Sequence, residues 1–338
     1  MQVIHGIEAA RLSGVVLTIG NFDGVHRGHR ALLETGVELA RRGGTRLAVM
    51  TFEPHPAAIL TPDRVPPTLT PPHEKLRLMA AAGAEIVVVV ESRPEFFALS
   101  AGEFIHDVIV SRFRPRALVE GKDFRFGRHR QGDLALLRAA GAARGFEVHV
   151  VEPIRAALGG QPDTVISSSL IRHLLGSGNV DRAAECLGRP YALFGTVQRG
   201  SGRGRTLGFP TANLAVEDQL IPAEGVYVGR AAIEGHEAGE WRVADGGGRI
   251  GEETRSAGKG ESQLRAAAIS IGRTPTFESK ELLVEAHLLD FDGDLYGRRI
   301  RLEFLEWLRA QQRFDSVGLL KDQIARDVKR AREPAATW

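Results

Sequence analysis

The sequence predicts two domains: an α/β domain with a doubly wound parallel sheet, then a small antiparallel β-barrel with a terminal helix. The chain has 338 residues, more than a single domain usually holds. In its first half, short β-branched runs alternate with helical stretches, which is typical of a parallel sheet. In its second half, strand-like runs follow one another across Gly, Pro and Asp turns, which favours a barrel or sandwich. We place the boundary near Arg189, so that the domains comprise residues 1–188 and 189–338.

The strands of the first domain are expected to be buried on both faces, because their runs are almost entirely apolar. Apolar spacing at Leu33, Val37 and Ala40 predicts a helix after the first run, and Asp133 is a predicted N-cap of a later helix. Two further helices, in SSLIRHLLGSG and VDRAAECLG, end the domain, the second of them at Gly188. The strand runs are VVLTIG, RLAVMTF, EIVVVV, ALVEG and FEVHVVEP.

The second domain is predicted to close with a helix from Asp315 to about Arg332, which stops at Pro334 and packs on the outside of the barrel. The segment DFDGDLYG before the last strand predicts a hairpin with an Asp-Gly turn. The predicted strand runs are RPYALFGTVQRGSGRGRTLGFPTANLAV, GVYVGRAAI, AAAISIG, ELLVEAHLLDFDG and RRIRLEFLEWL. The apolar stripe of the final helix consists of Val317, Leu320, Ile324 and Val328.

Composition excludes several classes of protein. The 44 basic and 42 acidic residues leave a net charge of +2, and the basic residues are scattered, so a nucleic-acid groove is disfavoured. The lone Cys186 cannot close an intramolecular disulfide, and no apolar run approaches the roughly 20 residues of a membrane-spanning helix. No signal peptide is apparent, so a cytoplasmic location is expected; weak self-association stays open. The stretch at about 239–264 is rich in Gly, Ser and charge and has no period of its own, which predicts a solvated loop. Its AGKG is not a P-loop, because Gly260 stands where Ser or Thr is needed and Glu253 where the first glycine belongs.

The segment LTIGNFDGVHRGHRALLE, residues 17–34, lies between a predicted strand and a predicted helix. One interpretation is a tight turn made by Gly20, Gly24 and Gly28, with two histidines facing water. The other is a polyphosphate site, because free amides and the helix dipole at a helix start attract phosphate oxygens. His26 and His29 are three residues apart, so both imidazoles can face one anion. That arrangement suits attack on the α-phosphate of a nucleoside triphosphate.

GNFDGVHRGH resembles the GxFDGxHxGH signature of the adenylyltransferase module in bacterial bifunctional riboflavin kinase/FAD synthetases. That module belongs to the HxGH nucleotidyltransferase superfamily, which has a Rossmann-like fold. The resemblance continues through FEPHP (52–56), EGKDFRFG (120–127) and ISSSLIR (166–172), in the order and spacing of the family. With the second half included, it covers nearly the whole chain.

The resemblance implies that His26 and His29 are catalytic and stabilise charge at the α-phosphate of ATP during transfer. It also implies a flavin site beside Pro54, Pro56 and Asp123, where two prolines near an aromatic ring form a rigid apolar surface. From the residues alone, the serines of ISSSLIR could equally be N-caps, and FEPHP could be a buried turn. The nucleotide-binding residues implied in this half are Gly20, Phe22, Asp23, Gly24, Gly28, Ser167, Ser168, Ser169 and Arg172.

A second candidate site begins at GRGRTLGFPTANL, residues 202–214, which matches the riboflavin kinase signature GRxLGFPTAN. Taken alone, PTAN could be a turn, although Thr211 and Asn213 offer neutral oxygen ligands of the kind that Mg²⁺ accepts when phosphates supply the rest. The resemblance implies that these two residues lie near the metal and ATP. It also implies nucleotide contacts from Gly204, Arg205 and Gly208.

Strand alternation in LLVEAHLLDF places Glu285 and His287 on the face opposite the apolar residues. A solvated face is the usual reason for such a carboxylate. The resemblance instead implies that Glu285 is the base that receives the proton of the ribityl 5′-hydroxyl, whereas His287 is expected to be structural.

We therefore expect a bifunctional enzyme with riboflavin, FMN and FAD as substrates and products. The barrel would phosphorylate riboflavin with MgATP, and the α/β domain would join FMN to the AMP moiety of a second ATP. One rival is an HxGH transferase for another acceptor, and another is a flavin-binding regulator without catalysis. No nucleic-acid or membrane partner is expected.

Overall fold

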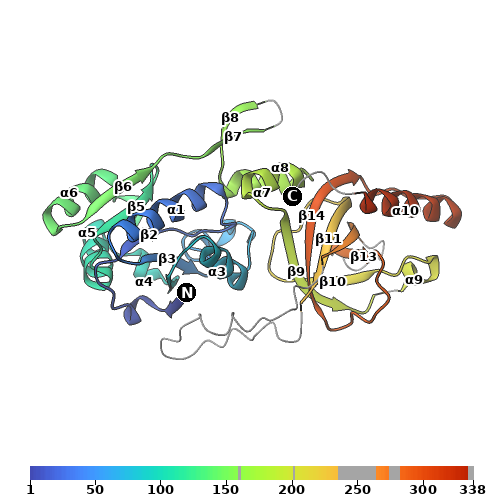
Figure 1. Cartoon of the computed structure of the whole chain (residues 1–338), viewed down its shortest axis with the longest axis horizontal. Helices are drawn as coiled ribbons and strands as arrows, with labels where there is room; N and C mark the ends of the chain where they lie inside the picture. Colours follow the sequence, from blue (N-terminus) through green and yellow to red (C-terminus); the bar gives the residue numbers. More distant parts are fainter. Residues whose placement is uncertain (159–160, 201, 235–263, 274–281, 334–338) are drawn as a thin grey trace.

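The computed structural model describes residues 1–158, 161–200, 202–234, 264–273 and 282–333. An α/β domain and a β-barrel lie side by side, with helices α7 and α8 between them (Figure 1). The Gly-rich stretch predicted as a loop falls outside the described residues except for Leu264, and Pro334 falls outside them too.

The first domain is built on a six-stranded sheet with the order β1-β4-β3-β2-β5-β6. All of its strand pairs are parallel. From β2 the chain adds strands to one side through β3 and β4, then to the other through β5 and β6, so the order reverses beside β2. The predicted doubly wound sheet is confirmed, with β1 as an extra edge strand. Its strands are β1 (Gln2–His5), β2 (Val16–Ile19), β3 (Leu47–Glu53), β4 (Ile86–Glu91), β5 (Ala117–Gly121) and β6 (Glu147–Val151).

Helices cover both faces of this sheet. Leu33 of α1 and Met79 of α3 are buried in the cluster on one face, and Ile109 of η3 and Leu137 of α6 are buried in the cluster on the other. Asp133 accepts the backbone N–H of Leu136 at 2.9 Å, which confirms it as an N-cap. These elements are η1 (Ile7–Ala9), α1 (Arg27–Arg42), α2 (Ala57–Leu60), η2 (Pro62–Arg64), α3 (Pro72–Ala81), α4 (Pro94–Phe97), α5 (Ala101–Glu103), η3 (Phe104–Phe113), η4 (Arg128–Arg130) and α6 (Leu134–Arg144).

Two elements lead from the sheet to the barrel. An antiparallel hairpin of β7 (Arg155–Leu158) and β8 (Gln161–Val165), which the sequence pattern did not predict, projects beside α7 (Figure 1). The two predicted helices follow as α7 (Ser168–Gly176) and α8 (Val180–Leu187). Gly188 ends α8 in the left-handed conformation, at a φ of +71°, as expected for a helix-terminating glycine.

The second domain is a closed antiparallel barrel with the strand order β10-β13-β12-β11-β14-β9, which confirms the predicted barrel. The predicted hairpin at DFDGDLYG is wrong, because β13 pairs with β10 and β12 whereas β14 pairs with β9 and β11. A short helix also interrupts the first predicted strand run. The elements are β9 (Tyr191–Gln198), α9 (Arg203–Leu207), β10 (Ala212–Val216), β11 (Gly225–Ile233), β12 (Arg265–Arg273), β13 (Leu282–Leu288) and β14 (Arg299–Arg309).

The final helix α10 (Val317–Arg332) packs on the outside of the barrel through its second half. Val328 and Ala331 contact a small apolar cluster there, and Arg309 of β14 pairs with the buried Asp327 at 2.7 Å. The predicted stripe is wrong at Val317, which is 62% exposed. These anchors hold only the carboxy-terminal half of the helix, so its first turn stays in solvent.

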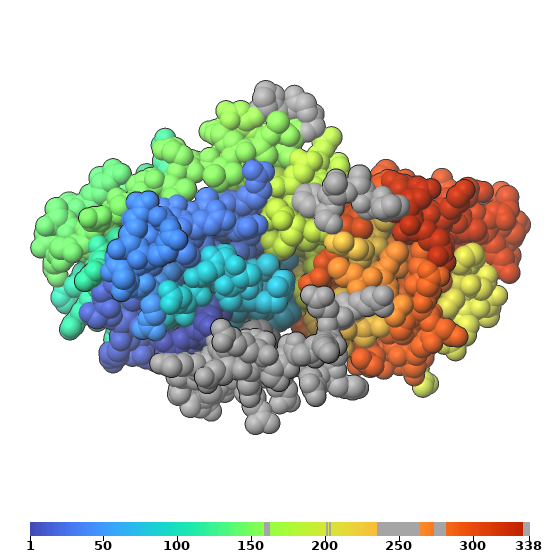
Figure 2. Space-filling model, in the orientation of Figure 1, coloured from blue at the N-terminus to red at the C-terminus, as the bar shows by residue number. Residues whose placement is uncertain are grey.

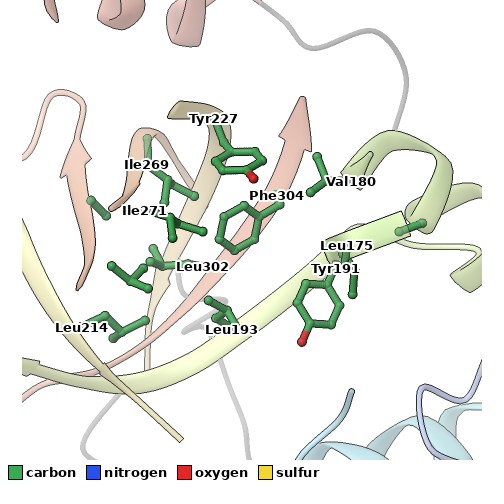
Figure 3. Packing of buried hydrophobic residues seen from close by; sticks show 14 of the residues in the cluster. Leu175, Val180, Tyr191, Leu193, Leu214, Tyr227, Ile269, Ile271, Leu302 and Phe304 are labelled. Atoms are coloured by element: carbon green, nitrogen blue, oxygen red, sulfur yellow. The ribbon is translucent and has the colours of Figure 1, made fainter. Parts of the chain in front are cut away.

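The interior of the barrel and the buried faces of α7 and α8 form one apolar cluster. Figure 3 shows Tyr227 of β11 and Phe304 of β14 on the side of the barrel that faces Val180 of α8. Leu175 of α7 lies in the same cluster and has no exposed surface. The space-filling view likewise shows the α7–α8 segment in contact with both halves of the chain (Figure 2). The helices that end the first domain are therefore also part of the core of the second.

We predict that Leu175→Ala lowers the free energy of unfolding by about 2–5 kcal/mol, because it leaves a cavity in this shared cluster. Urea denaturation followed by circular dichroism measures the change. Leu136→Ala on α6 is the matched control, because Leu136 is 41% exposed and its loss should cost less than about 0.5 kcal/mol. Equal losses for the two variants would show that Leu175 does not belong to a stabilising core.

Candidate active sites

Three of the motifs singled out in the sequence meet at one edge of the parallel sheet. GNFDGVHRGH follows β2, FEPHP begins with the last two residues of β3, and the segment with Asp123 follows β5. These strands are neighbours and parallel, so their carboxyl ends lie together. Open α/β sheets bind ligands at such an edge, where the strand order reverses.

His26 and His29 lie at the start of α1 with their rings stacked, at 3.7 Å between centroids and 16° between planes. His26 is the N-cap of the helix, and its Nδ1 accepts the backbone N–H of His29 at 3.3 Å. A neutral His26 that accepts at Nδ1 carries its proton on Nε2. The structure therefore brings the two predicted catalytic residues together and assigns His26 a capping role that the sequence did not indicate.

Both imidazoles favour the neutral state. Burial, together with the positive charges of Arg189 and Arg172, lowers the pKa of His26 from 6.5 to about 4. Burial also holds the pKa of His29 well below its usual value, and His26 adds to this effect. Within the described residues, Nδ1 of His29 is buried without a hydrogen-bond partner. At pH 7 the rings can thus donate hydrogen bonds to a phosphate without carrying charge themselves.

The glycines of the turn leave room for this histidine pair. A Cβ atom at Gly28 would lie 3.1 Å from the His26 ring, and Gly24 has a φ of +88° that favours glycine. A Cβ at Gly20 would lie 3.1 Å from the ring of Phe22. Phe22 itself is fully buried, with its ring centroid 5.1 Å from that of His29. Phe22 therefore supports the His29 ring from within the protein.

The Asp23 carboxylate is occupied by protein groups. It is buried and accepts the backbone N–H groups of Leu69 and Thr70 at 3.0 Å each. It also pairs with Arg172 of α7, whose Nε donates to the carbonyl of Pro67 at 2.8 Å. Two residues expected to bind nucleotide thus bind each other and connect the glycine turn with α7.

The three serines of ISSSLIR have different environments. Ser167 caps α7 by accepting the N–H of Leu170 at 3.2 Å, so the capping interpretation holds for this residue. Ser168 donates its hydroxyl to the Asp23 carbonyl at 2.9 Å, and Ser169 is exposed. The start of α7 is therefore joined to the glycine turn by one serine and by Arg172.

A series of aromatic contacts connects the other two motifs at this edge. Ring centroids lie 5.8 Å apart between Phe52 and Phe96, 6.0 Å between Phe96 and Phe104, and 5.4 Å between Phe104 and Phe126. Phe124 follows at 5.6 Å from Phe126. The residues expected to contact a flavin border this series: Pro54 and Pro56, which follow Phe52, and the exposed Asp123, which precedes Phe124.

Two buried ionisable residues near this edge were not identified from the sequence. Lys75 donates to the Phe52 carbonyl at 3.2 Å and to the Glu53 carboxylate at 3.1 Å, which holds the start of FEPHP. Glu120 of β5 accepts the backbone N–H of Ile19 at 2.9 Å. Burial raises the pKa of Glu120 well above its usual value. A charged residue inside an otherwise apolar strand run was the available signal for Glu120.

The barrel brings Thr211, Asn213 and Glu285 together. Asn213 of β10 is the cross-strand partner of Glu285 on β13, and the Thr211 hydroxyl lies 3.5 Å from a Glu285 carboxylate oxygen. Val284 and Ala286 are buried inside the barrel, so Glu285 lies on the outer face, as the alternation predicted.

The loop before β10 is held against this site. His287 contacts the Pro210 carbonyl through Nδ1 at 2.8 Å, which is consistent with the structural role expected for it. A Cβ at Gly204 would lie 2.5 Å from the Phe209 carbonyl and 2.9 Å from the Thr211 hydroxyl, so only glycine fits. Gly208 ends α9 at a φ of +90°, and Arg205 on that helix is exposed.

Comparison with known proteins identifies both halves. Residues 8–169 match the family model of FAD synthetase, and residues 187–335 match that of riboflavin kinase. The bifunctional riboflavin kinase/FMN adenylyltransferase of Escherichia coli K12 is 41% identical over 330 residues, which cover 98% of this chain and 96% of that enzyme. The chain belongs to this bifunctional family. The Bacillus subtilis family member is 32% identical over 94% of this chain and 91% of its own length.

The fold of the whole chain is also found in a solved structure. A Streptococcus pneumoniae protein whose structure is titled a macrolide-efflux protein has a TM-score of 0.82 at 28% identity, covering 98% of this chain and 99% of that one. Among the described residues here, no helix is long and apolar enough to cross a membrane.

The family assigns the two activities to the two domains. The α/β domain is the FMN adenylyltransferase and the barrel is the riboflavin kinase, in the order that the sequence predicted. The riboflavin kinase half argues against the rival interpretation of a transferase for another acceptor.

We predict that Glu120→Gln stabilises the protein at pH 8 and has little effect at pH 4. The folded protein favours the protonated carboxyl, because burial raises the pKa of Glu120. The wild type therefore loses stability as the pH rises above the pKa that Glu120 has in the unfolded state. The amide of the Gln variant does not ionise, so the variant does not lose stability in this way. Urea unfolding at both pH values measures the difference. A variant less stable than the wild type at pH 8 would contradict the prediction.

Proposed function

We propose that the α/β domain transfers AMP from ATP to FMN at the carboxyl edge of β2, β3 and β5, and that the barrel phosphorylates riboflavin beside Thr211, Asn213 and Glu285. The proposed adenylyl transfer is supported mainly by the stacked pair of His26 and His29 at the start of α1. The proposed kinase reaction is supported by the position of the Glu285 carboxylate next to the neutral oxygen donors Thr211 and Asn213.

In the adenylyl transfer, a phosphate oxygen of FMN attacks the α-phosphate of ATP, and pyrophosphate leaves. The charge that develops on the α-phosphate oxygens is stabilised by the N–H groups of His26 and His29 together with the positive end of α1. Gly20, Gly24 and Gly28 let the phosphates approach the backbone. Phe22, Asp23, Ser167 and Ser168 shape the turn, while Ser169 and Arg172 lie at the start of α7, where the triphosphate would pass.

The flavin is proposed to lie along the phenylalanine series between FEPHP and Asp123. An isoalloxazine ring stacks favourably on aromatic and proline surfaces, and Pro54 and Pro56 provide such a surface next to Phe52. The support for this placement is that the two motifs border one continuous series of ring contacts.

In the kinase reaction, Glu285 accepts the proton of the riboflavin 5′-hydroxyl as that oxygen attacks the γ-phosphate of a second ATP. Thr211 and Asn213 offer neutral oxygens next to this carboxylate, a donor set that fits Mg²⁺ held mainly by ATP phosphates. When bound, the ion neutralises charge on the transferred phosphoryl group. Gly204, Arg205 and Gly208 place the loop around α9 where it would contact the nucleotide.

The functional division lies at residues 188/189, where α8 ends before β9 begins. Both reactions take place in the cytoplasm, where ATP is available. Weak self-association is compatible with either active site and is measured by sedimentation.

We predict that His29→Ala lowers the rate of FAD formation from FMN by roughly 10²–10³-fold and leaves FMN formation unchanged, because one donor to the α-phosphate is lost. Glu285→Gln should do the reverse, because the amide keeps the shape but cannot accept the proton. Chromatography measures FMN made from riboflavin and, in a separate incubation, FAD made from supplied FMN, each with ATP and Mg²⁺. Loss of both activities in either folded variant would show that the two sites are not chemically separate.

A further inference from the structure

Arg189, in the link between α8 and β9, reaches back into the glycine turn of the first domain. Its Nη2 donates to the carbonyl of Gly24 at 2.7 Å, and its Nη1 lies 3.4 Å from the carbonyls of Val25 and Leu187. Gly24 and Val25 directly precede His26. A residue of the interdomain link thus holds the segment that positions a histidine of the adenylyltransferase site.

The guanidinium of Arg189 makes no ion pair within the part of the chain that the structure describes, since its three hydrogen-bond acceptors are all main-chain carbonyls. Burial lowers the pKa of Arg189 to about 10, so the group remains charged at pH 7. Arg172, the other cation near His26, is instead paired with Asp23. Arg189 is therefore held by carbonyl groups and not by a paired carboxylate, although the Glu74 carboxylate of α3 acts on its charge from a distance, as do the cations Arg77 and Arg30.

The carbonyls that Arg189 binds belong to an unusual stretch of backbone. Gly24 has a φ of +88° and Val25 a φ of +39°, a region that a β-branched residue rarely adopts. Such a conformation persists only where surrounding contacts enforce it. The Arg189 hydrogen bonds are contacts of this kind, and they act immediately before the N-cap of α1.

We propose that Arg189 is a positioning residue for adenylyl transfer. It fixes the Gly24–Val25 backbone so that His26 and His29 face the α-phosphate, and it contributes a positive charge, held by carbonyl groups, beside the anionic triphosphate. This inference rests on the proposed placement of ATP at the start of α1.

The pKa of His26 depends on the charged and titratable groups around it, so it reports the loss of the Arg189 charge. They are Arg189 from the link, Arg172 from α7 with its partner Asp23 in the turn, and His29 from α1. Removing the Arg189 charge removes a repulsion against protonated His26, so the pKa of His26 rises. Protonation would occupy Nδ1 and break the cap to His29. The acid limb of the pH profile for FAD formation then moves to higher pH.

The test compares Arg189→Gln with Arg189→Lys in the full chain. For Arg189→Gln we expect kcat for FAD formation from FMN to fall about 10²-fold, because the catalytic histidines are displaced. We also expect the acid limb of the pH profile for FAD formation to move to higher pH. Arg189→Lys keeps the charge but not the fork of donors, so kcat should fall less and the acid limb should stay in place. Arg41→Gln, on an exposed residue of α1, should match the wild type in both respects.

Formation of FMN from riboflavin, measured on the same preparations, should be unchanged and shows that the variants are folded. The proposal is overturned if Arg189→Gln keeps the wild-type kcat and pH profile. It is also overturned if FMN formation and FAD formation fall in parallel with no shift of the acid limb, since that marks a purely structural role. If His29→Ala is fully active, the proposed ATP placement fails instead, and that result is distinct from either outcome at Arg189.

Discussion

The buried carboxylate of Asp23 is the constraint on which the adenylyltransferase site depends. A charge this far from water is stable only when it is paired and hydrogen-bonded, and Asp23 has two backbone N–H groups and Arg172 as partners. The Ser168 hydroxyl adds a bond to the carbonyl of the same residue. Through these contacts the glycine turn, the segment before α3 and the start of α7 are held in one arrangement around the histidine pair.

The same segment before α3 also joins the two domains. Thr68 accepts the backbone N–H of Leu220 at 2.7 Å, and the Leu69 carbonyl lies 3.3 Å from Nε2 of the buried Gln219. The other end of Gln219 accepts the N–H of Phe194 on β9 at 2.9 Å. Each active site draws its reacting groups from one domain, yet the backbone that holds Asp23 is shared with the barrel. The two active sites are therefore chemically independent, although the two domains are connected through this backbone segment.

Local patterns were sufficient to predict much of the fold, because β-branched runs, apolar spacing and terminating glycines act over a few residues. The interactions that organise the first site are not local: Arg172 lies 149 residues from Asp23, and Arg189 lies 165 residues from Gly24. The hairpin prediction at DFDGDLYG was wrong for the same reason, since barrel closure pairs β14 with strands far from it in the sequence. Motif spacing predicted which residues gather at each site, but not that Asp23 and Arg172 would bind each other.

A double-mutant cycle of Asp23→Asn and Arg172→Met, read as the free energy of unfolding, tests this account most directly. Each single change should lower that free energy by about 3–5 kcal/mol, because it leaves the other charge buried and unpaired. The double variant should lose far less than the sum of the two. If the losses instead add to within about 0.5 kcal/mol, the two residues do not act as a pair, and the buried carboxylate does not organise the site.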